Sequence, residues 1–173
     1  NSSWNFAMNM LDSVGIAGQT LVATALGAGS VSRARQLTRA TGRAGLVTGA
    51  IIGVVFAIVG LFAGHLFSPT PHVQILIAVG MVTMGVFFPL QGWMMAIDGI
   101  LIGARDYRYL AGTCTLTAVV YIALILVLAS IVTPIMPNDL SRTAMLWAAF
   151  NVVLMGGRGL FNGLRVRSDV WMK

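Results

Sequence analysis

Four long apolar runs constrain this sequence more than any other feature. They lie at about residues 44–67, 73–104, 109–132 and 142–164. Each is long enough to cross a hydrocarbon core of roughly 30 Å, which takes about 20 helical residues. Charged residues make up only 9% of the 173-residue chain, whereas a soluble domain usually carries about 25%. The sequence therefore predicts an all-α fold, a polytopic transmembrane helix bundle.

A fifth and more polar helix is expected ahead of these four, at about residues 4–29. Its polar residues fall on one stripe at helical spacing, and that stripe should face protein or water rather than lipid. They are Asn5, Asn9, Asp12 and Gln19. The segment that follows, residues 30–43, holds four arginines, and we expect it to form a short amphipathic segment at the membrane surface.

The second helix carries small residues on a nearly continuous face. In a membrane, such residues let two helix backbones approach closely. They are Gly45, Gly49, Gly53, Ala57, Gly60 and Gly64. We expect this face to pack against another helix rather than to contact a ligand.

Basic residues are divided unevenly between the connecting segments. Segment 30–43 has four, 105–108 has two and the tail from Arg165 has three, whereas 65–74 has none and 133–142 has one. The side richer in arginine and lysine stays cytoplasmic, so the amino end is expected outside and the carboxyl end inside. Arg158 is expected to snorkel to the cytoplasmic side. The net charge of +6 is therefore interpreted as a topology signal, with no nucleic-acid partner.

Motifs for catalysis are absent from the sequence. There is no HExxH zinc motif, no GxSxG nucleophile elbow and no Walker-type loop, and GAGSVS lacks the third glycine of a dinucleotide fingerprint. The single Cys114 excludes a disulfide framework and a cysteine-cluster metal site. His65 and His72 are too isolated to supply the three or four ligands of a metal site. We expect neither enzymatic activity nor a metal or cofactor.

Two aspartates, Asp12 and Asp98, lie within predicted helices, where an ionisable residue is expensive and usually functional. Asp12 is interpreted either as a titrating or cation-binding group or as a carboxyl locked against a neighbouring helix. Asp98 either couples to an ion or braces the helix ends beside Arg105. Distances along the helices place Asp98 about 10 Å and Asp12 about 25 Å from their cytoplasmic ends, so we expect no single ion to bridge both. Asp106, in the following loop, is expected to be solvated.

Several polar, aromatic and methionine side chains are candidates for lining a substrate cavity, although such residues are also common in ordinary packing. They are Asn5, Asn9, Gln19, Gln91, Trp93, Met94, Tyr121 and Asn151. With the two aspartates they make up the predicted site.

Two stretches resemble the multidrug and toxic compound extrusion (MATE) transporters, and within them the DinF-type branch. LDSVGIAGQTLVATALGAGS, residues 11–30, resembles a helix ending with a Gln, Val, Leu-Gly-Ala-Gly pattern before an arginine-rich segment. IDGILIGARDYRYL, residues 97–110, resembles the Asp-Gly, Ile-Gly-Ala, Asp, Arg-Tyr-Leu pattern of a later helix pair. Asp12 and Asp98 match positions where this branch tends to carry an acid.

The resemblance implies a fold and an activity. The family has twelve helices in two related lobes, and this chain is similar to the eighth through twelfth. Residues 1–173 would then be a partial carboxyl-terminal lobe, and the amino-terminal lobe and the first helix of this lobe would be missing. The implied activity is secondary active transport, in which H⁺ or Na⁺ enters as amphipathic or cationic drug-like compounds are exported across the plasma membrane.

Two alternatives stay open. One is a lipid-linked precursor flippase of the same superfamily, which a wide cationic groove would favour. The other is a non-transporting membrane module that packs against partners without moving solute.

Overall fold

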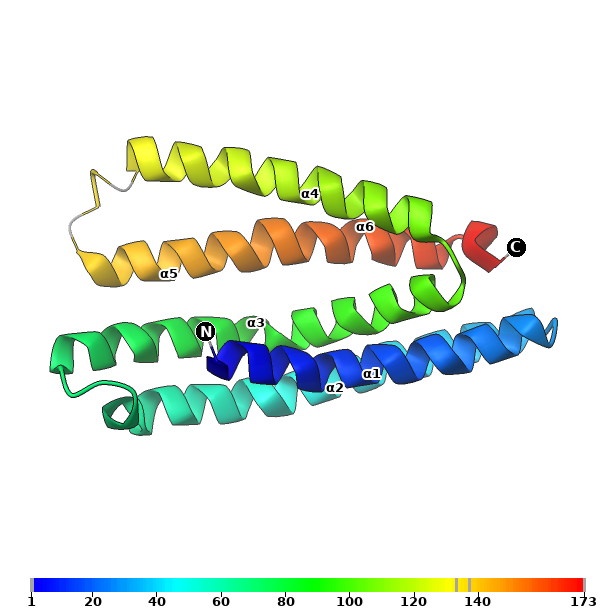
Figure 1. Ribbon diagram of the computed structural model, residues 1–173, viewed down its shortest axis with the longest axis horizontal. Coiled ribbons are helices and arrows are strands. Elements are labelled where there is room, and N and C mark those ends of the chain that lie inside the picture. The colour runs from blue at the N-terminus through cyan, green and yellow to red at the C-terminus, as the bar shows by residue number, and fades with distance from the viewer. Residues whose placement is uncertain (1, 133, 137, 173) are drawn as a thin grey trace.

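The computed structural model describes residues 2–132, 134–136 and 138–172. Over these residues five long helices lie side by side, and no strand occurs among them (Figure 1). They are α1 (Ser2–Gly27), α2 (Val31–Phe62), α3 (Pro71–Gly103), α4 (Tyr107–Val127) with the π-helical turn η2 (Leu128–Val132), and α5 (Asp139–Ala149) with the π-helical segment η3 (Phe150–Met155) and α6 (Gly156–Arg167). The predicted all-α, five-helix architecture is confirmed.

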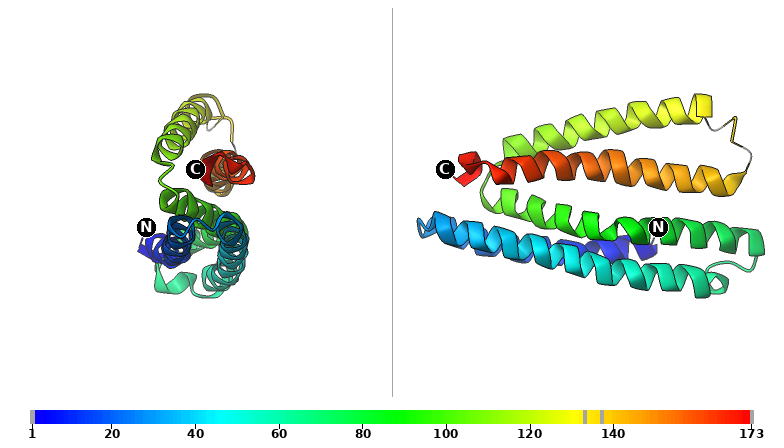
Figure 2. Two further views of the ribbon diagram at one scale, coloured as in Figure 1. Left: turned by 90° about the vertical axis from the view of Figure 1, so that its right-hand side faces the viewer. Right: turned by 180° about the vertical axis from the view of Figure 1, so that it is seen from behind.

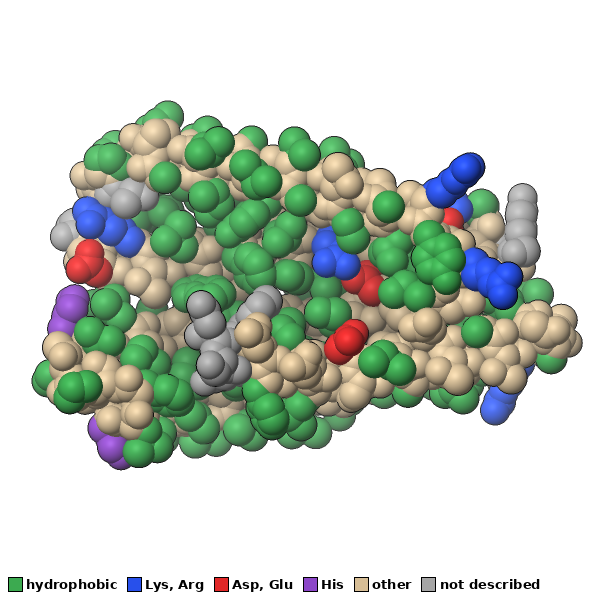
Figure 3. All heavy atoms as spheres, in the orientation of Figure 1, with side chains coloured by type: hydrophobic (Ala, Val, Ile, Leu, Met, Phe, Trp, Pro, Cys, Tyr) green, Lys and Arg blue, Asp and Glu red, His purple; other side chains and the backbone are tan. Residues whose placement is uncertain are grey.

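Four of these helices are long and apolar enough to cross a membrane: Val31–Phe62, Pro71–Gly103, Tyr107–Val132 and Asp139–Arg167. Their outer surfaces are covered with hydrophobic side chains (Figure 3). On α2, for example, Ile51, Val54 and Ile58 are all more than half exposed. Helices of this kind satisfy their own backbone hydrogen bonds and expose apolar side chains to lipid. The chain is therefore a multi-pass membrane protein.

The largest departure from the sequence expectation is the start of α2. Residues 30–43 do not form a separate segment at the membrane surface, because α2 runs continuously from Val31 to Phe62. One face of its first part is buried, and the buried residues recur every three or four positions: Ala34, Thr38, Thr41 and Gly42. Packing of this small-residue face against α1 and α3 holds the arginine-rich segment in the bundle. The helix α2 also ends at Phe62, before the expected end at about residue 67.

The helix α3 is the centre of the bundle. It packs against α1 and α2 on one side and against α5 and α6 on the other, whereas α4 lies outermost beside α6 (Figures 1 and 2). The α1–α2 and α3–α4 connections and the carboxyl end lie at one end of the bundle, and the α2–α3 and α4–α5 connections lie at the other (Figure 1). A short 3-10 turn, η1 (Gly64–Leu66), follows α2, and another, η4 (Asp169–Met172), closes the chain.

Glycines allow the backbones of α2 and α3 to touch. Gly45 faces Gly92, Gly49 faces the carbonyl of Phe88, and a Cβ added to Gly85 would lie 2.6 Å from the carbonyl oxygen of Gly53. No side chain fits in such a gap, so these positions require glycine. The predicted packing role of the small-residue face is confirmed at this contact.

Gly49→Ala is expected to lower the free energy of unfolding by roughly 1–3 kcal/mol, because the new methyl group overpacks the α2–α3 contact. Chemical unfolding in detergent micelles, followed by circular dichroism, measures the change. Gly112→Ala on α4 is the matched control, since nothing lies within 4 Å of its added Cβ. That variant should be neutral or slightly more stable. Equal losses in the two variants would contradict the packing role.

Candidate functional site

A buried polar network joins α3, α4 and α6 inside the bundle. The carboxylate of Asp98 accepts a hydrogen bond from Asn162 Nδ2 at 2.6 Å and pairs through its other oxygen with Arg158 Nη2. Arg158 and Asn162 are four residues apart, so they share one face of α6. From α4, the hydroxyl of Thr113 donates to Asn162 Oδ1 at 3.0 Å. Three helices are thus linked through one amide and one ion pair.

The Asp98–Arg158 pair is well shielded from solvent, since the two side chains are 8% and 23% exposed. A charge within a membrane span is tolerated when it is paired, and removal of either partner would leave the other uncompensated. Arg105, the expected partner of Asp98, is instead exposed in the α3–α4 turn with φ 61°. That expectation was wrong, as was the expectation that Arg158 snorkels to the membrane surface.

A second polar contact lies two helical turns from Asp98 on the same face of α3. Gln91 Nε2 donates to Asn151 Oδ1, and Asn151 Nδ2 donates to the carbonyl of Trp147 at 2.7 Å. Both amides are fully buried. Among the described residues none bonds to Gln91 Oε1. The polar face of α3 therefore meets α5, η3 and α6 at two levels.

Asp12 lies on the exposed side of α1, close to the level of Asp98. A Cβ added to Gly15, one turn after Asp12, would lie 2.8 Å from the carbonyl oxygen of Met95 and 3.8 Å from Asp12 Oδ1. Gly15 also contacts Gly99, which places the two aspartates within about 3 Å of each other along the helix axes. Figure 3 shows acidic and basic side chains close together near the middle of this face.

The expectation that the two carboxylates lie at different depths is therefore wrong. It assumed that their helices end at one level, whereas Gly103, the last residue of α3, packs against Gln19 of α1. The helix α1 continues to Gly27, which is about 12 Å farther at 1.5 Å per residue.

The structure brings only some of the predicted cavity residues together. The interface between α3 and the last helix, formed by α5, η3 and α6, contains Gln91, Asn151 and Asp98. Asn5 and Asn9 are exposed on α1, and Gln19 is half-buried there. The other three are packed: Met94 is fully buried, Trp93 lies between Gly42 and Gly163, and the ring of Tyr121 meets that of Phe150 edge-on at 5.9 Å.

Sequence reasoning also missed a cluster that ties the α3–α4 turn to α6. Arg165 Nε donates to Asp106 Oδ2 at 2.7 Å, and its guanidinium lies 4.7 Å from the centre of the Tyr109 ring. The Tyr109 hydroxyl donates to the carbonyl of Phe161 at 2.7 Å. Asp106 is thus 14% exposed and paired, not solvated as expected. A signal was present, because Arg158, Asn162 and Arg165 recur at helical spacing.

The arrangement supplies a buried ion pair and three buried amides within the spanning helices, and one exposed carboxylate on the neighbouring α1. Within the part of the chain that the structure describes, no three His, Cys, Asp or Glu side chains gather as metal ligands would. Ionisable groups placed in this way typically mark ion or substrate pathways. The fold and the site define a polytopic membrane protein with the charged interior of a transporter.

Comparison with known proteins gives the family. The MatE family model matches residues 1–132, so the chain belongs to the MatE family, whose members are transporters. The protein "Protein DETOXIFICATION 42" of Arabidopsis thaliana is 27% identical over 127 residues, which cover 73% of this chain and 25% of the relative. The chain thus spans about a quarter of that relative's length. No solved structure matches.

Asp98→Ala is expected to lower the free energy of unfolding by roughly 3–5 kcal/mol, because Arg158 is left buried without its counter-charge. Adding Arg158→Ala should recover part of this loss, giving a coupling energy of at least about 1 kcal/mol in a double-mutant cycle. Chemical unfolding in detergent micelles measures the free energy of unfolding of the wild type, the two single variants and the double variant.

The exposed Asp139–Arg142 pair is the control for this cycle. Its side chains are 58% and 37% exposed and 3.4 Å apart, so its coupling should stay within about 0–1 kcal/mol. Additive losses at Asp98 and Arg158 would show that the buried pair is not energetically coupled.

Proposed function

We propose that this chain forms part of a cation-coupled antiporter that exports amphipathic or cationic drug-like compounds in exchange for H⁺ or Na⁺. The observation that supports this function best is the placement of Asp12. Its exposed carboxylate lies at the depth of the Asp98–Arg158 pair, within a bundle of the MatE family. A free carboxylate beside a paired one gives a site whose charge changes when a cation binds.

The exchange follows from the electrostatics of these groups. Among the described residues none donates a hydrogen bond to Asp12 or forms an ion pair with it, so its oxygens are available to a cation. Because one carboxylate neutralises one cation at a time, a proton or Na⁺ competes with a cationic substrate. This competition is the basis of antiport, and alternating access makes it vectorial.

The remaining parts of the transporter would lie against the exposed face of α1. Phe6 and Ile16 on this helix are 66% and 56% exposed, as expected of a face that packs against further helices. In this proposal the chain supplies most of a carboxyl-terminal lobe of the DinF-type branch. The first helix of that lobe and the amino-terminal lobe complete the substrate path. We also propose that the protein lies in the plasma membrane.

The flippase alternative is less favoured by the distribution of charge. A lipid-linked precursor needs positive charge along its path across the membrane, whereas the arginines of α2 and the tail gather at one end of the bundle. A non-transporting module remains distinguishable by experiment, since it inserts into vesicles and gives no uptake.

Asp12→Asn in the transport-competent protein is expected to reduce cation-coupled efflux at least tenfold, because the amide cannot exchange a proton or hold a cation by charge. Proteoliposomes loaded with ethidium and given a pH or Na⁺ gradient measure this rate. Stability should hardly change, since none of the described residues bonds to Asp12. Asp139→Asn, also an exposed carboxylate, should leave efflux unchanged. Undiminished, gradient-dependent efflux by Asp12→Asn would refute the coupling role.

The proposed cytoplasmic carboxyl end is tested by cysteine labelling. In a Cys114→Ser background, a membrane-impermeant maleimide should label Thr70→Cys in right-side-out vesicles. Ala28→Cys should react only after the vesicles are permeabilised, because the α1–α2 and α2–α3 connections lie at opposite ends of the bundle. Both positions are exposed. The reverse labelling pattern would invert the topology.

A further inference from the structure

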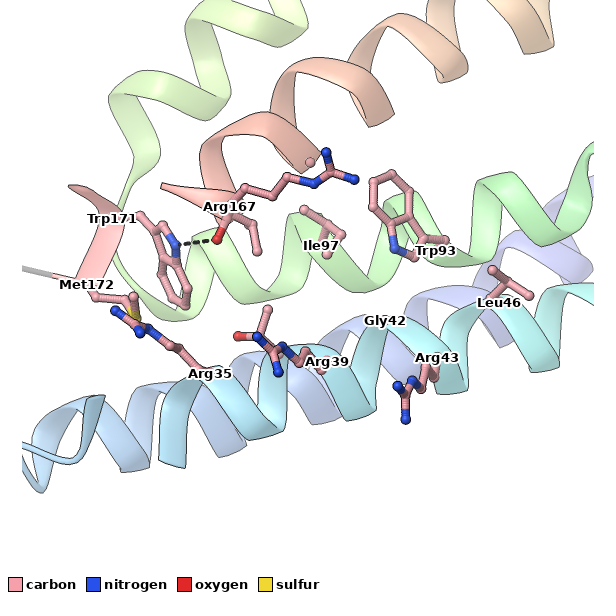
Figure 4. Close-up of a pocket in the computed structure, with 13 residues that line it drawn as sticks. Arg35, Arg39, Gly42, Arg43, Leu46, Trp93, Ile97, Arg167, Trp171 and Met172 are labelled. Carbon is pink, nitrogen blue, oxygen red and sulfur yellow. Dashed lines mark hydrogen bonds between the residues drawn. The ribbon is translucent and has the colours of Figure 1, made fainter. Parts of the chain in front are cut away.

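A basic pocket of about 550 Å³ lies between α2, α3 and the carboxyl-terminal segment formed by α6 and η4. Its walls include Arg35, Arg39, Arg43, Arg167, Trp93 and Trp171. In Figure 4 the arginines of α2 lie on one side of the pocket, and Arg167 and Trp171 lie on the other. Trp93 was among the predicted cavity residues, but the proposed coupling site at Asp12 and Asp98 uses none of the residues of this pocket.

The described residues do not balance the charges of Arg39, Arg43 and Arg167 in this pocket. Arg39 and Arg43 are four residues apart, so they share one face of α2, where like charges repel. Within the described residues no carboxylate lines the pocket. None pairs with Arg39, Arg43 or Arg167 there, because the ion pairs of the described residues involve other arginines. An anion between α2 and α6 would relieve the repulsion.

Two tryptophans shape the other walls. Trp171 is buried, and its indole N–H donates to the carbonyl of Val166 at 3.0 Å, as the dashed line in Figure 4 shows. The ring of Trp93 is held between the helix backbones at Gly42 and Gly163. The pocket thus combines guanidinium groups with the aromatic walls formed by Trp93 and Trp171.

The outer face of α2 leads from the arginines directly onto apolar surface. Leu46 lines the pocket, and Val47 and Val54 follow Arg43 at helical spacing. All three are about half exposed. A ligand with a charged head in the pocket could therefore lay a hydrocarbon chain along α2. A free phosphate ion would contact the arginine side chains and leave the apolar surface of α2 uncovered.

We propose that this pocket binds the phosphate headgroup of an anionic phospholipid, with an acyl chain lying on α2. Arginine matches phosphate oxygens through paired N–H donors, and basic pockets between transmembrane helices on the cytoplasmic side bind such headgroups. The bound lipid bridges α2 and α6, which belong to opposite sides of α3. It therefore stabilises the packing of the last helix on the first three.

The proposal is tested by titrating the purified chain in detergent micelles and counting bound lipids by native mass spectrometry. Dioleoylphosphatidylglycerol should bind at least about tenfold more tightly than dioleoylphosphatidylcholine, and excess inorganic phosphate should not displace it. Equal binding of the two lipids would overturn the proposal without the need for any variant. Displacement by inorganic phosphate would overturn the lipid assignment in favour of a free anion.

A matched pair of double variants then locates the site. Arg39→Gln/Arg43→Gln should weaken phosphatidylglycerol binding about tenfold or more. Arg33→Gln/Arg108→Gln removes the same charge from exposed arginines outside the pocket and should change binding less than about twofold. Arg39→Lys/Arg43→Lys, which retains the charge, should lie between them. Equal losses in the two glutamine variants would mean that diffuse surface charge, not this pocket, attracts the lipid.

Discussion

The backbone contact between α2 and α3 is the constraint on which the rest of the bundle depends. Between helices in lipid there is no hydrophobic driving force, so close van der Waals packing must hold them together. Gly45, Gly49 and Gly53 provide that contact along α2. Once this side of α3 is fixed, its remaining faces are also assigned. One meets α1 through Gly99, and another turns its polar side chains toward the last helix.

The proposed transport site and the basic pocket both follow from this arrangement, because α3 separates two differently built halves of the bundle. On one side, α1 and α2 pack through glycines. On the other, Asp98 and Gln91 hold the last helix through an ion pair and an amide contact. Hydrogen bonds and ion pairs inside the membrane depend on direction and can change partners, whereas the glycine contacts do neither. The last helix is thus attached through groups that a change in charge can affect.

The sequence predicted the five helices because an apolar run of bilayer length has few ways other than a helix to satisfy its backbone hydrogen bonds in lipid. It also singled out Asp98, Gln91 and Asn151, since polar groups are rare in such runs. It did not pair Asp98 with Arg158, 60 residues away, because no local pattern shows which helices become neighbours. Nor does sequence reveal how far one helix end extends past another, which decided the depth of Asp12. The arginines at residues 33–43 led to the prediction of a surface segment, and the buried small residues between them were not recognised as a packing face.

The π-helical segment Phe150–Met155 has a consequence for how the last helix can move. A π turn carries one residue more than an α turn, so α5 and α6 are joined with a register offset of about 100°. Asn151 lies within this segment and Arg158 lies three residues after it, and both side chains bond to residues of α3. If the wide turn migrated or closed, α6 would rotate as a unit and carry Arg158 away from Asp98, while α5 stayed in place. The π-helical segment is therefore the point at which a change of register would turn α6 relative to α5.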